Sequence, residues 1–262
     1  MRHLHVIGIG AGDPDHLSVE AVAVLQSVDA FLVIDKGAAT DELADVRRQI
    51  VARHRPDGGF RWVVIAEAER DRSPADYSGE VRSWHAERAA RIGNALRDEL
   101  GPDEVGAILV WGDPSLYDST LRMLDAIAER GTVPFTRSVT AGVTSISALA
   151  AAHQIPLHRI GESMLITTGR RLTEPDGWPA SIANAIVMLD ADCSFRHLLG
   201  HSASEQLEIW WGAYLGMPGQ LLVSGRLAEV ADEIVRVRAA AKAEHGWIMD
   251  VYLLRRPAPA AS

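Results

Sequence analysis

The chain of 262 residues has a single cysteine, few aromatic residues and no excess of positive charge. With Cys193 alone no internal disulfide can form, and nothing in the sequence around it supports a nucleophilic role, so we expect a structural thiol in a reducing compartment. Lysine and arginine together number 26 against 35 aspartates and glutamates, which gives a net charge of −9. This balance argues against a general nucleic-acid binder, which would be basic.

Long apolar runs are also missing. The longest uncharged stretch, residues 209–225, is interrupted by glycines and Pro218 and would be a poor membrane span. The chain opens directly on a strand-like segment without the pattern of a secretory signal. No Cys/His pair has the spacing of metal ligands. We therefore expect a cytoplasmic protein with no metal site, no membrane association and no nucleic-acid partner.

Apolar residues make up 47% of the chain, enough for more than one core, and the length predicts two compact units. Short apolar runs alternate with longer amphipathic segments in the first half, which predicts an α/β unit with a mostly parallel sheet. The expected strands are 3–9, 30–34, 62–65 and 107–110. Ser18 is expected to cap a helix, and 79–100 is expected to be a surface helix after a polar loop at 68–79.

The segment "HQIPLHRIG" ends a helix of small residues with Pro156 and Gly161, and it is the best candidate for a boundary. We expect an N-terminal α/β domain over 1–153 and a C-terminal α/β domain with a mixed sheet over 162–262. Strand candidates in the second half are "SMLITTG", "AIVMLD", "LEIWWGA" and "WIMDVYLL". A helix is expected over 227–241.

The first loop, in "VIGIGAGDPD", has glycines at alternate positions, as a dinucleotide-binding loop does. The fingerprint G-x-G-x-x-G requires a third glycine three residues after the second. Counted from Gly8, that position is Asp13, whose carboxylate would repel a pyrophosphate. The loop therefore predicts a tight, open turn that ends in Asp13 rather than an NAD site.

Two later loops share this setting at the end of an expected strand. "LVWGDPSLYDS" again places Gly-Asp-Pro after a buried run, and small residues precede a helix in "SVTAGVTSISA". The carboxyl ends of parallel strands meet at one edge of a sheet, where ligands of α/β proteins bind. The three loops together predict a ligand site at that edge.

These motifs carry a resemblance to a known family. "GIGAGDPDHLSVEAV", "VWGDPSLYDS", "TAGVTSISALAAAHQIPLHR" and "YLGMPGQLLVSGRLAEVADEI" resemble the signature regions of the tetrapyrrole (corrin/porphyrin) methylases, and the likeness covers nearly the whole chain. The resemblance implies a two-domain α/β methyltransferase that uses S-adenosyl-L-methionine in a cleft between its domains. One departure is Ala11, where the family usually has proline.

Within that family, "VIDKG", "RDRSPADY…WHAERA" and "EIWWGAYLG" look most like a member of aerobic cobalamin biosynthesis. The resemblance implies methylation of precorrin-5 at C-1 with loss of the acetyl group as acetate. It also implies a homodimer, since family members are commonly dimers.

The resemblance assigns cofactor contacts by position. In the second loop they are Gly112, Asp113 and Leu116, and capping of its own turn is the open alternative for Asp113. The third loop contributes Thr144 and Ser145. In the second half the matching positions are Leu189 and Leu215, for which a plain core role stays open.

The substrate implied by the resemblance carries many carboxylates, which arginine and lysine would orient. Basic side chains expected just after strands are Lys36, Arg170, Arg171 and Arg196, with solvated surface charge as the alternative. Asp13 is the expected proton acceptor and Tyr117 the expected hydrogen-bond donor at the ring. The sequence identifies no general base for deacetylation, and His5, His16 and His85 are candidates by residue type only.

Three other functions remain open at this point. A related methyltransferase acting on another precorrin, or on RNA or protein, would share the scaffold. A NAD-binding oxidoreductase would bind the nucleotide at the first loop, and a tetrapyrrole carrier would bind the ring without the cofactor.

Overall fold

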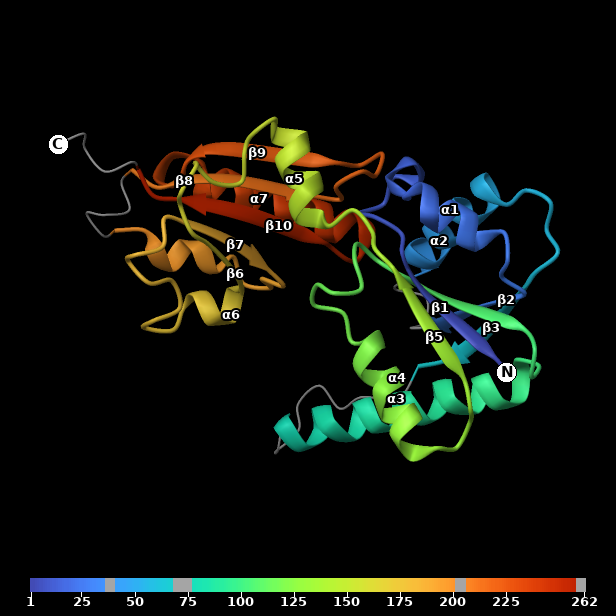
Figure 1. Ribbon diagram of the computed structural model, residues 1–262. Coiled ribbons are helices and arrows are strands. Elements are labelled where there is room, and N and C mark those ends of the chain that lie inside the picture. The colour runs from blue at the N-terminus through green and yellow to red at the C-terminus, as the bar shows by residue number, and fades with distance from the viewer. Residues whose placement is uncertain (36–40, 68–76, 201–205, 258–262) are drawn as a thin grey trace. The chain divides into compact units, whose positions relative to one another are not determined.

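The computed structural model describes the backbone of residues 1–35, 41–67, 77–200 and 206–257, and the side chains of these residues except 41, 42 and 77–82. The chain divides into two compact units, Met1–Thr144 and Ser145–Ser262. Each unit is built on its own five-stranded sheet (Figure 1). The expected α/β fold, with a parallel first sheet and a mixed second sheet, is confirmed.

The sheet of unit 1 has the order β3-β2-β4-β1-β5, and every neighbouring pair is parallel. Its strands are β1 (His3–Gly8), β2 (Ala30–Asp35), β3 (Arg61–Ala66), β4 (Val105–Val110) and β5 (Thr136–Thr140). Parallel strands need crossover connections, which here are mostly helices. The helices are α1 (Val19–Leu25), α2 (Asp41–His54), α3 (Tyr77–Glu99) and α4 (Thr120–Arg130). Figure 1 shows α3 and α4 along one face of this sheet and α1 and α2 along the other.

Successive side chains of β1 point alternately toward the two layers of helices. Leu4 and Val6 pack with Ile92 and Leu96 of α3 in one core cluster. Ile7, which points to the opposite face, is equally buried. Helices thus cover both faces of the sheet, and the loops at the ends of its strands remain accessible.

The sheet of unit 2 has the order β6-β7-β10-β8-β9, with β6 and β7 parallel and the other pairs antiparallel. Its strands are β6 (Met164–Thr168), β7 (Asn184–Met188), β8 (Glu208–Ala213), β9 (Leu221–Arg226) and β10 (Asp250–Arg255). The helices are α5 (Ser145–His153), α6 (Gly169–Leu172) and α7 (Leu227–His245), with short 3-10 turns at η1 (Pro14–His16) in unit 1 and η3 (Ser194–Leu198) in unit 2. Trp211 and Tyr252 are the largest buried side chains of the cluster under α7.

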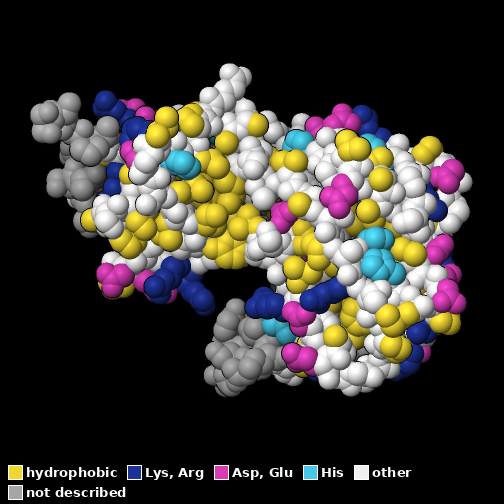
Figure 2. All heavy atoms as spheres, in the orientation of Figure 1, with side chains coloured by type: hydrophobic (Ala, Val, Ile, Leu, Met, Phe, Trp, Pro, Cys, Tyr) yellow, Lys and Arg dark blue, Asp and Glu magenta, His cyan; other side chains and the backbone are white. Residues whose placement is uncertain are grey.

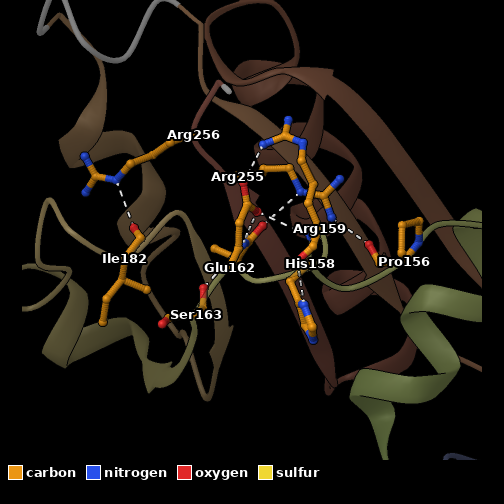
Figure 3. Close-up of polar contacts among 9 residues, drawn as sticks. Pro156, His158, Arg159, Glu162, Ser163, Ile182, Arg255 and Arg256 are labelled. Atoms are coloured by element: carbon orange, nitrogen blue, oxygen red, sulfur yellow. Dashed lines mark hydrogen bonds and ion pairs between the residues drawn. The ribbon is translucent and has the colours of Figure 1, made fainter. Parts of the chain in front are cut away.

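The division falls at the start of α5, before the turn-rich segment where the sequence places the boundary. Helix α5 packs on β8 and β10 and so belongs with unit 2. The segment after it is also fastened there, because Arg255 donates from Nη2 to the carbonyl of Pro156 at 2.6 Å and from Nε to Asn184 Oδ1 at 2.9 Å (Figure 3). Glu162 accepts from Arg159 at 3.1 Å and from Asn184 at 2.9 Å.

Candidate functional site

The loops that follow β1 and β4 are joined by their backbones. The amide of Gly10 donates to the carbonyl of Gly112 at 3.2 Å, and the amide of Gly112 donates to the carbonyl of Gly10 at 2.8 Å. These strands are neighbours in the sheet, and their chains continue toward opposite edges, β1 to β2 and β4 to β5. The junction therefore lies where an open α/β sheet reverses its direction of winding, the usual place for a ligand.

The third loop, after β5, fits against the first two through glycine. A Cβ built on Gly8 would lie 2.5 Å from the amide nitrogen of Gly142 and 2.8 Å from the carbonyl oxygen of Gly112. A Cβ on Gly142 would overlap the Gly112 carbonyl and approach the Gly8 carbonyl carbon to 2.7 Å. Only glycine permits backbones to approach this closely, so the three loops form one rigid unit.

Asp113 connects the second loop to the third. Its Oδ2 accepts from the amide of Gly142 at 2.9 Å, while Oδ1 accepts from the amide of Ser115 at 2.8 Å and from the Ser115 hydroxyl. Burial would raise the pKa of Asp113, but these hydrogen bonds outweigh it and hold the pKa below its ordinary value. The carboxylate thus stays charged and fixes two loops at once.

Gly112 differs from the other glycines of this junction because one side of it is open. Its φ is +67°, and a Cβ added there would meet nothing within 4 Å. The left-handed backbone explains the glycine, and the open side leaves room for a group to approach the main chain. The adjoining turn places the Leu116 amide 3.2 Å from the Asp113 carbonyl, with Leu116 half-buried.

Tyr117 follows in this loop with an unusual backbone. Its φ is +52°, its side chain is 46% exposed, and burial of its inner part raises the pKa of its hydroxyl. A bulky residue in the left-handed region costs free energy and is held there by its surroundings, a pattern that clusters at functional sites. The neutral hydroxyl can donate a hydrogen bond, and its expected contact with the substrate ring stays a prediction.

Asp13 forms the N-cap of the first loop's 3-10 turn. Its Oδ1 accepts from the amide of Asp15 at 2.8 Å, and its carbonyl accepts from His16 at 2.9 Å. The side chain is half-buried, so one carboxylate oxygen shapes the turn and the other adds no hydrogen bond among the described residues. Thr144 is the half-buried last residue of unit 1, and Ser145 begins α5 in unit 2.

Leu189 and Leu215 occupy contrasting places in unit 2. Leu189 follows β7 with a φ of +53° and is 67% exposed, although its side chain is apolar. Figure 2 shows hydrophobic side chains gathered on unit 2 in the region of β6 and β7, and Ile166 of β6 is also exposed. Leu215 is buried at 4% exposure, which fits the core role that the sequence left open for it.

The backbone of Leu189 is held by the residue after it. Asp190, 6% exposed, accepts from the Ser194 amide at 2.6 Å and from the Tyr252 hydroxyl at 2.7 Å. A Cβ on Gly169 would overlap the Asp190 carboxyl group, so glycine is required opposite it. Cys193 lies in this buried loop, and burial raises the pKa of its thiol. A raised pKa fits the structural role expected for it.

The proposed basic residues that the structure describes lie in unit 2. Arg170 and Arg171 lie exposed in α6, where Arg171 pairs with Glu174. Arg196 is exposed in η3. Lys36 lies outside the described residues.

The three histidines named by type have different surroundings. Burial, with a smaller effect of His3, lowers the pKa of His5, whose Nδ1 lies 2.5 Å from the Ser138 hydroxyl. His16 packs beneath Gly10, and its Nδ1 is buried without a hydrogen-bond partner in the described part of the chain. His85 contacts the ring of Trp84 with centroids 4.8 Å apart.

Two arginines at the carboxyl end of the first sheet were not predicted from the sequence as site residues. Arg47 of α2 lies over the ring of Trp111, which directly follows β4, at 5.8 Å. Arg88 of α3 lies over Trp84 at 5.1 Å. Trp111 beside the "GDP" turn was the available signal, since an indole at a ligand-binding loop suits a flat, partly charged ligand.

Neither a metal cluster nor a membrane span is found where the structure can be described. No group of three or more His, Cys, Asp or Glu residues is placed to hold a metal ion there. Within the same residues, no helix combines the length and the apolar character needed to cross a bilayer.

The fold and the three interlocked loops are those of a tetrapyrrole methylase. The family model for Tetrapyrrole (Corrin/Porphyrin) Methylases matches residues 3–231, so the chain belongs to this family of methyltransferases. Among curated relatives, "Precorrin-6A synthase [deacetylating]" from Sinorhizobium sp is 45% identical over 98% of this chain and 97% of its own. The resemblance stated from the motifs is confirmed, and a NAD-binding oxidoreductase is not favoured.

Solved structures show the same fold. A putative cobalamin synthesis related protein (CobF) from Corynebacterium diphtheriae superposes with a TM-score of 0.83 at 36% identity, covering 98% of this chain and 99% of that one. Uroporphyrin-III C-methyl transferase from Thermus thermophilus, in complex with S-adenosylhomocysteine, gives a TM-score of 0.57 at 18% identity, covering 97% of each chain. The second likeness shows the fold alone.

Proposed function

We propose that this protein is an S-adenosyl-L-methionine-dependent C-methyltransferase of aerobic cobalamin biosynthesis. Its reaction is the methylation of precorrin-5 at C-1, followed by loss of the acetyl group as acetate to give precorrin-6A. The observation that carries the proposal is the 45% identity to a precorrin-6A synthase, sustained over 98% of the chain. Similarity at this level along both units is what a shared substrate would require.

The loops of unit 1 suit the donor in their chemistry. When bound, S-adenosylmethionine supplies a methyl group on a positively charged sulfur. Such a transfer needs alignment of donor and acceptor more than acid–base help, and rigid backbone supplies alignment. The open side of Gly112 accommodates a group close to the main chain, and the charged Asp113 fixes the loop that presents it.

We assign donor contacts in each unit separately. In unit 1 they are Gly112, Asp113, Leu116 and Thr144. In unit 2 they are Ser145, Leu189 and Leu215, of which Leu189 has the accessible apolar side chain that a nucleoside could pack on. Leu215 is the weakest of the set, because little of its surface is available.

The ring is handled by polar side chains. Asp13 accepts a proton lost from the macrocycle, through the carboxylate oxygen that does not shape its turn. Tyr117 donates a hydrogen bond to the ring, since its raised pKa keeps the hydroxyl protonated. Lys36, Arg170, Arg171 and Arg196 are proposed to pair with the carboxylates of the substrate. Water attacks the acetyl carbonyl, the carbon–carbon bond to the ring breaks, and the ring takes the electron pair. Acetate leaves with the oxygen of the water, and both protons of the water are released.

Two assays test this function. Incubation with precorrin-5 and S-adenosylmethionine should give, by mass spectrometry, a product that has gained one methyl group and lost one acetyl group. Gain of methyl alone would show that the protein is a different precorrin methyltransferase. S-adenosylhomocysteine should raise the melting temperature because it binds only the folded state, and NAD should not.

A homodimer and a cytoplasmic location remain predictions. Sedimentation equilibrium on the purified chain tests the first, and fractionation of the producing cells tests the second.

A further inference from the structure

Two arginines reach the carboxyl end of the first sheet from opposite faces. Arg47 comes from α2 and Arg88 from α3, the helices that cover the two sides in Figure 1. They are 41 positions apart in the sequence. Asp118, in the loop after β4, acts electrostatically on both guanidinium groups. Arg47 also lies over Trp111, which directly follows β4, and Arg88 lies 3.3 Å from Glu67, which directly follows β3.

Arg47 fills a split in the sheet. Strands β2 and β4 pair only at Ala30–Gly106 and Phe31–Ala107, so they separate toward their carboxyl ends. The separation leaves the Leu109 carbonyl without a β2 partner, and Arg47 Nε donates to it at 3.2 Å. Its Nη1 donates to the carbonyl of Leu43 at 3.0 Å. Among the described residues, Nη2 has no hydrogen-bond acceptor and no carboxylate lies within ion-pair distance.

Arg88 is mostly buried and has one ion-pair partner among the described residues. Its side chain is 11% exposed, and its Nε lies 3.3 Å from Glu67 Oε1. The geometry of this contact does not make a hydrogen bond. The Nε–H of Arg88 is therefore buried without an acceptor in the described part of the chain. A buried guanidinium with so few acceptors is costly unless another anion completes its shell.

The electrostatics agree with this geometry. Burial lowers the pKa of both arginines, and the acidic groups nearby only partly reverse the effect. Asp118 is itself engaged, because its Oδ1 accepts from the amide of Thr120 at 2.6 Å at the start of α4. Its charge therefore compensates the two cations only from a distance.

We propose that Arg47 and Arg88 bind carboxylate side chains of the tetrapyrrole substrate, with the indoles of Trp111 and Trp84 beside them as flat apolar surfaces. The inference rests on the proposed function and adds two substrate-binding residues to it. Guanidinium groups match carboxylates with two parallel hydrogen bonds, and the unused donors on these arginines supply them. A polyanionic macrocycle with apolar ring faces can pair with the cations and pack against the neighbouring indole rings.

Glutamine substitutions test the proposal directly. Arg47→Gln and Arg88→Gln should each raise the KM for precorrin-5 about tenfold or more, as expected for loss of one charge-assisted pair, with a smaller effect on kcat. Binding of uroporphyrin III, a stable polycarboxylate tetrapyrrole, should weaken by a similar factor. The affinity for S-adenosylhomocysteine should stay unchanged, which also shows that the variants are folded.

Arg97→Gln is the matched control, because Arg97 lies near the end of the same helix as Arg88 and pairs with Asp98 on the surface. It should leave KM and porphyrin binding unchanged. If Arg47→Gln disturbs the split in the sheet and lowers the melting temperature, Arg47→Lys keeps the charge and should recover part of the affinity.

Equal KM and equal porphyrin affinity in wild type and both glutamine variants would overturn the proposal. A different result would contradict the proposed reaction and leave the carboxylate site in place. If the wild-type protein does not convert precorrin-5, yet binds uroporphyrin III in a manner that depends on both arginines, the carboxylate site stands and the proposed reaction falls.

Discussion

The main-chain amide of Gly142 donates a hydrogen bond to the carboxylate of Asp113 at 2.9 Å. One side chain at the end of β4 therefore fixes the loop at the end of β5. The same carboxylate caps its own turn through Ser115. Of the two roles weighed from the sequence, capping of its own turn is present, and contact with the donor stays a prediction.

Asp113→Asn should loosen both loops. The amide keeps one acceptor oxygen but loses the charge, and hydrogen bonds to charged groups contribute about 1.5–3 kcal/mol, with the lower end expected for this half-buried group. We expect a lower melting temperature and weaker S-adenosylhomocysteine binding, measured by calorimetry. Asp45→Asn, which removes only an exposed ion pair with Arg48, is the control. Unchanged binding in Asp113→Asn would remove this residue from the site.

The same variant should alter the dependence of stability on pH. The pKa of Asp113 is held below its ordinary value of 3.8, so its contribution is fully present above that value. The contribution is lost as the pH falls through the lower native pKa. Urea unfolding between pH 6 and pH 3 should therefore show a shallower loss of stability in the asparagine variant than in wild type.

Gly112 and Gly131 allow backbone strain to be separated from ligand contact. Both have positive φ, +67° and +63°, and neither would bring a Cβ within 4 Å of another atom. Alanine at either position should cost about 1–2 kcal/mol of stability through the left-handed backbone alone. Only Gly112→Ala should also weaken binding of S-adenosylhomocysteine, because Gly131 merely ends α4. Equal affinities in the two variants would show that nothing approaches Gly112.

The sequence predicts much of the fold because burial leaves periodic traces. Strands β1, β2 and β4 are enclosed on both faces and read as apolar runs, and the Ser18 cap is present, with its hydroxyl accepting from Ala21 at 3.0 Å. The expected strand ranges do not include β5, marked only by the loop after it, or β9, and both are edge strands. An edge strand needs fewer buried residues, and in "TRSVT" only Thr140 is buried. Val19, although apolar, is 88% exposed because it is the first residue of α1.

From the sequence, the candidate site could be predicted only where a short stretch of neighbouring residues defines it. Glycines, prolines and Asp113 mark turns, and a turn can be recognised from adjacent residues. Arg47 and Arg88 reach the same end of the sheet because two helices cover opposite faces of a sheet that splits between β2 and β4. That convergence depends on strand order, which no short stretch of sequence records.

Leu189 and Gln154 provide a matched pair for the second unit. Both are exposed residues with positive φ, +53° and +56°. Asparagine tolerates this conformation better, so Leu189→Asn and Gln154→Asn should each raise stability slightly, by up to about 1 kcal/mol. If the exposed leucine packs against the donor, only Leu189→Asn should lower the affinity for S-adenosylhomocysteine. Loss of affinity in both variants would point to a general effect on unit 2.

Glu104 lies at the opposite end of the first sheet from the loops of the candidate site. Its carboxylate accepts from Arg61 at 2.9 and 2.6 Å, and from the amide of Gly101 at 2.7 Å. The hydrogen bonds from Arg61, followed by that from Gly101, lower the pKa of Glu104 from 4.5 to about 2. These residues lie at the amino ends of β3 and β4, away from the loops with the glycine junction.

Glu104→Gln should therefore affect stability but not ligand binding. A depressed pKa means that the stabilisation is complete above about pH 4.5 and disappears as the pH falls toward 2. Because the pair is half-exposed and screened by water, the loss near pH 7 should be about 1 kcal/mol at most, and less in high salt. Urea unfolding at pH 7 and pH 3 measures it, with Glu129→Gln on the surface of α4 as control. A deficit that persists undiminished at pH 3 would show that the charge of Glu104 is not its source, while an altered affinity for S-adenosylhomocysteine would contradict the separation between the two ends of the sheet.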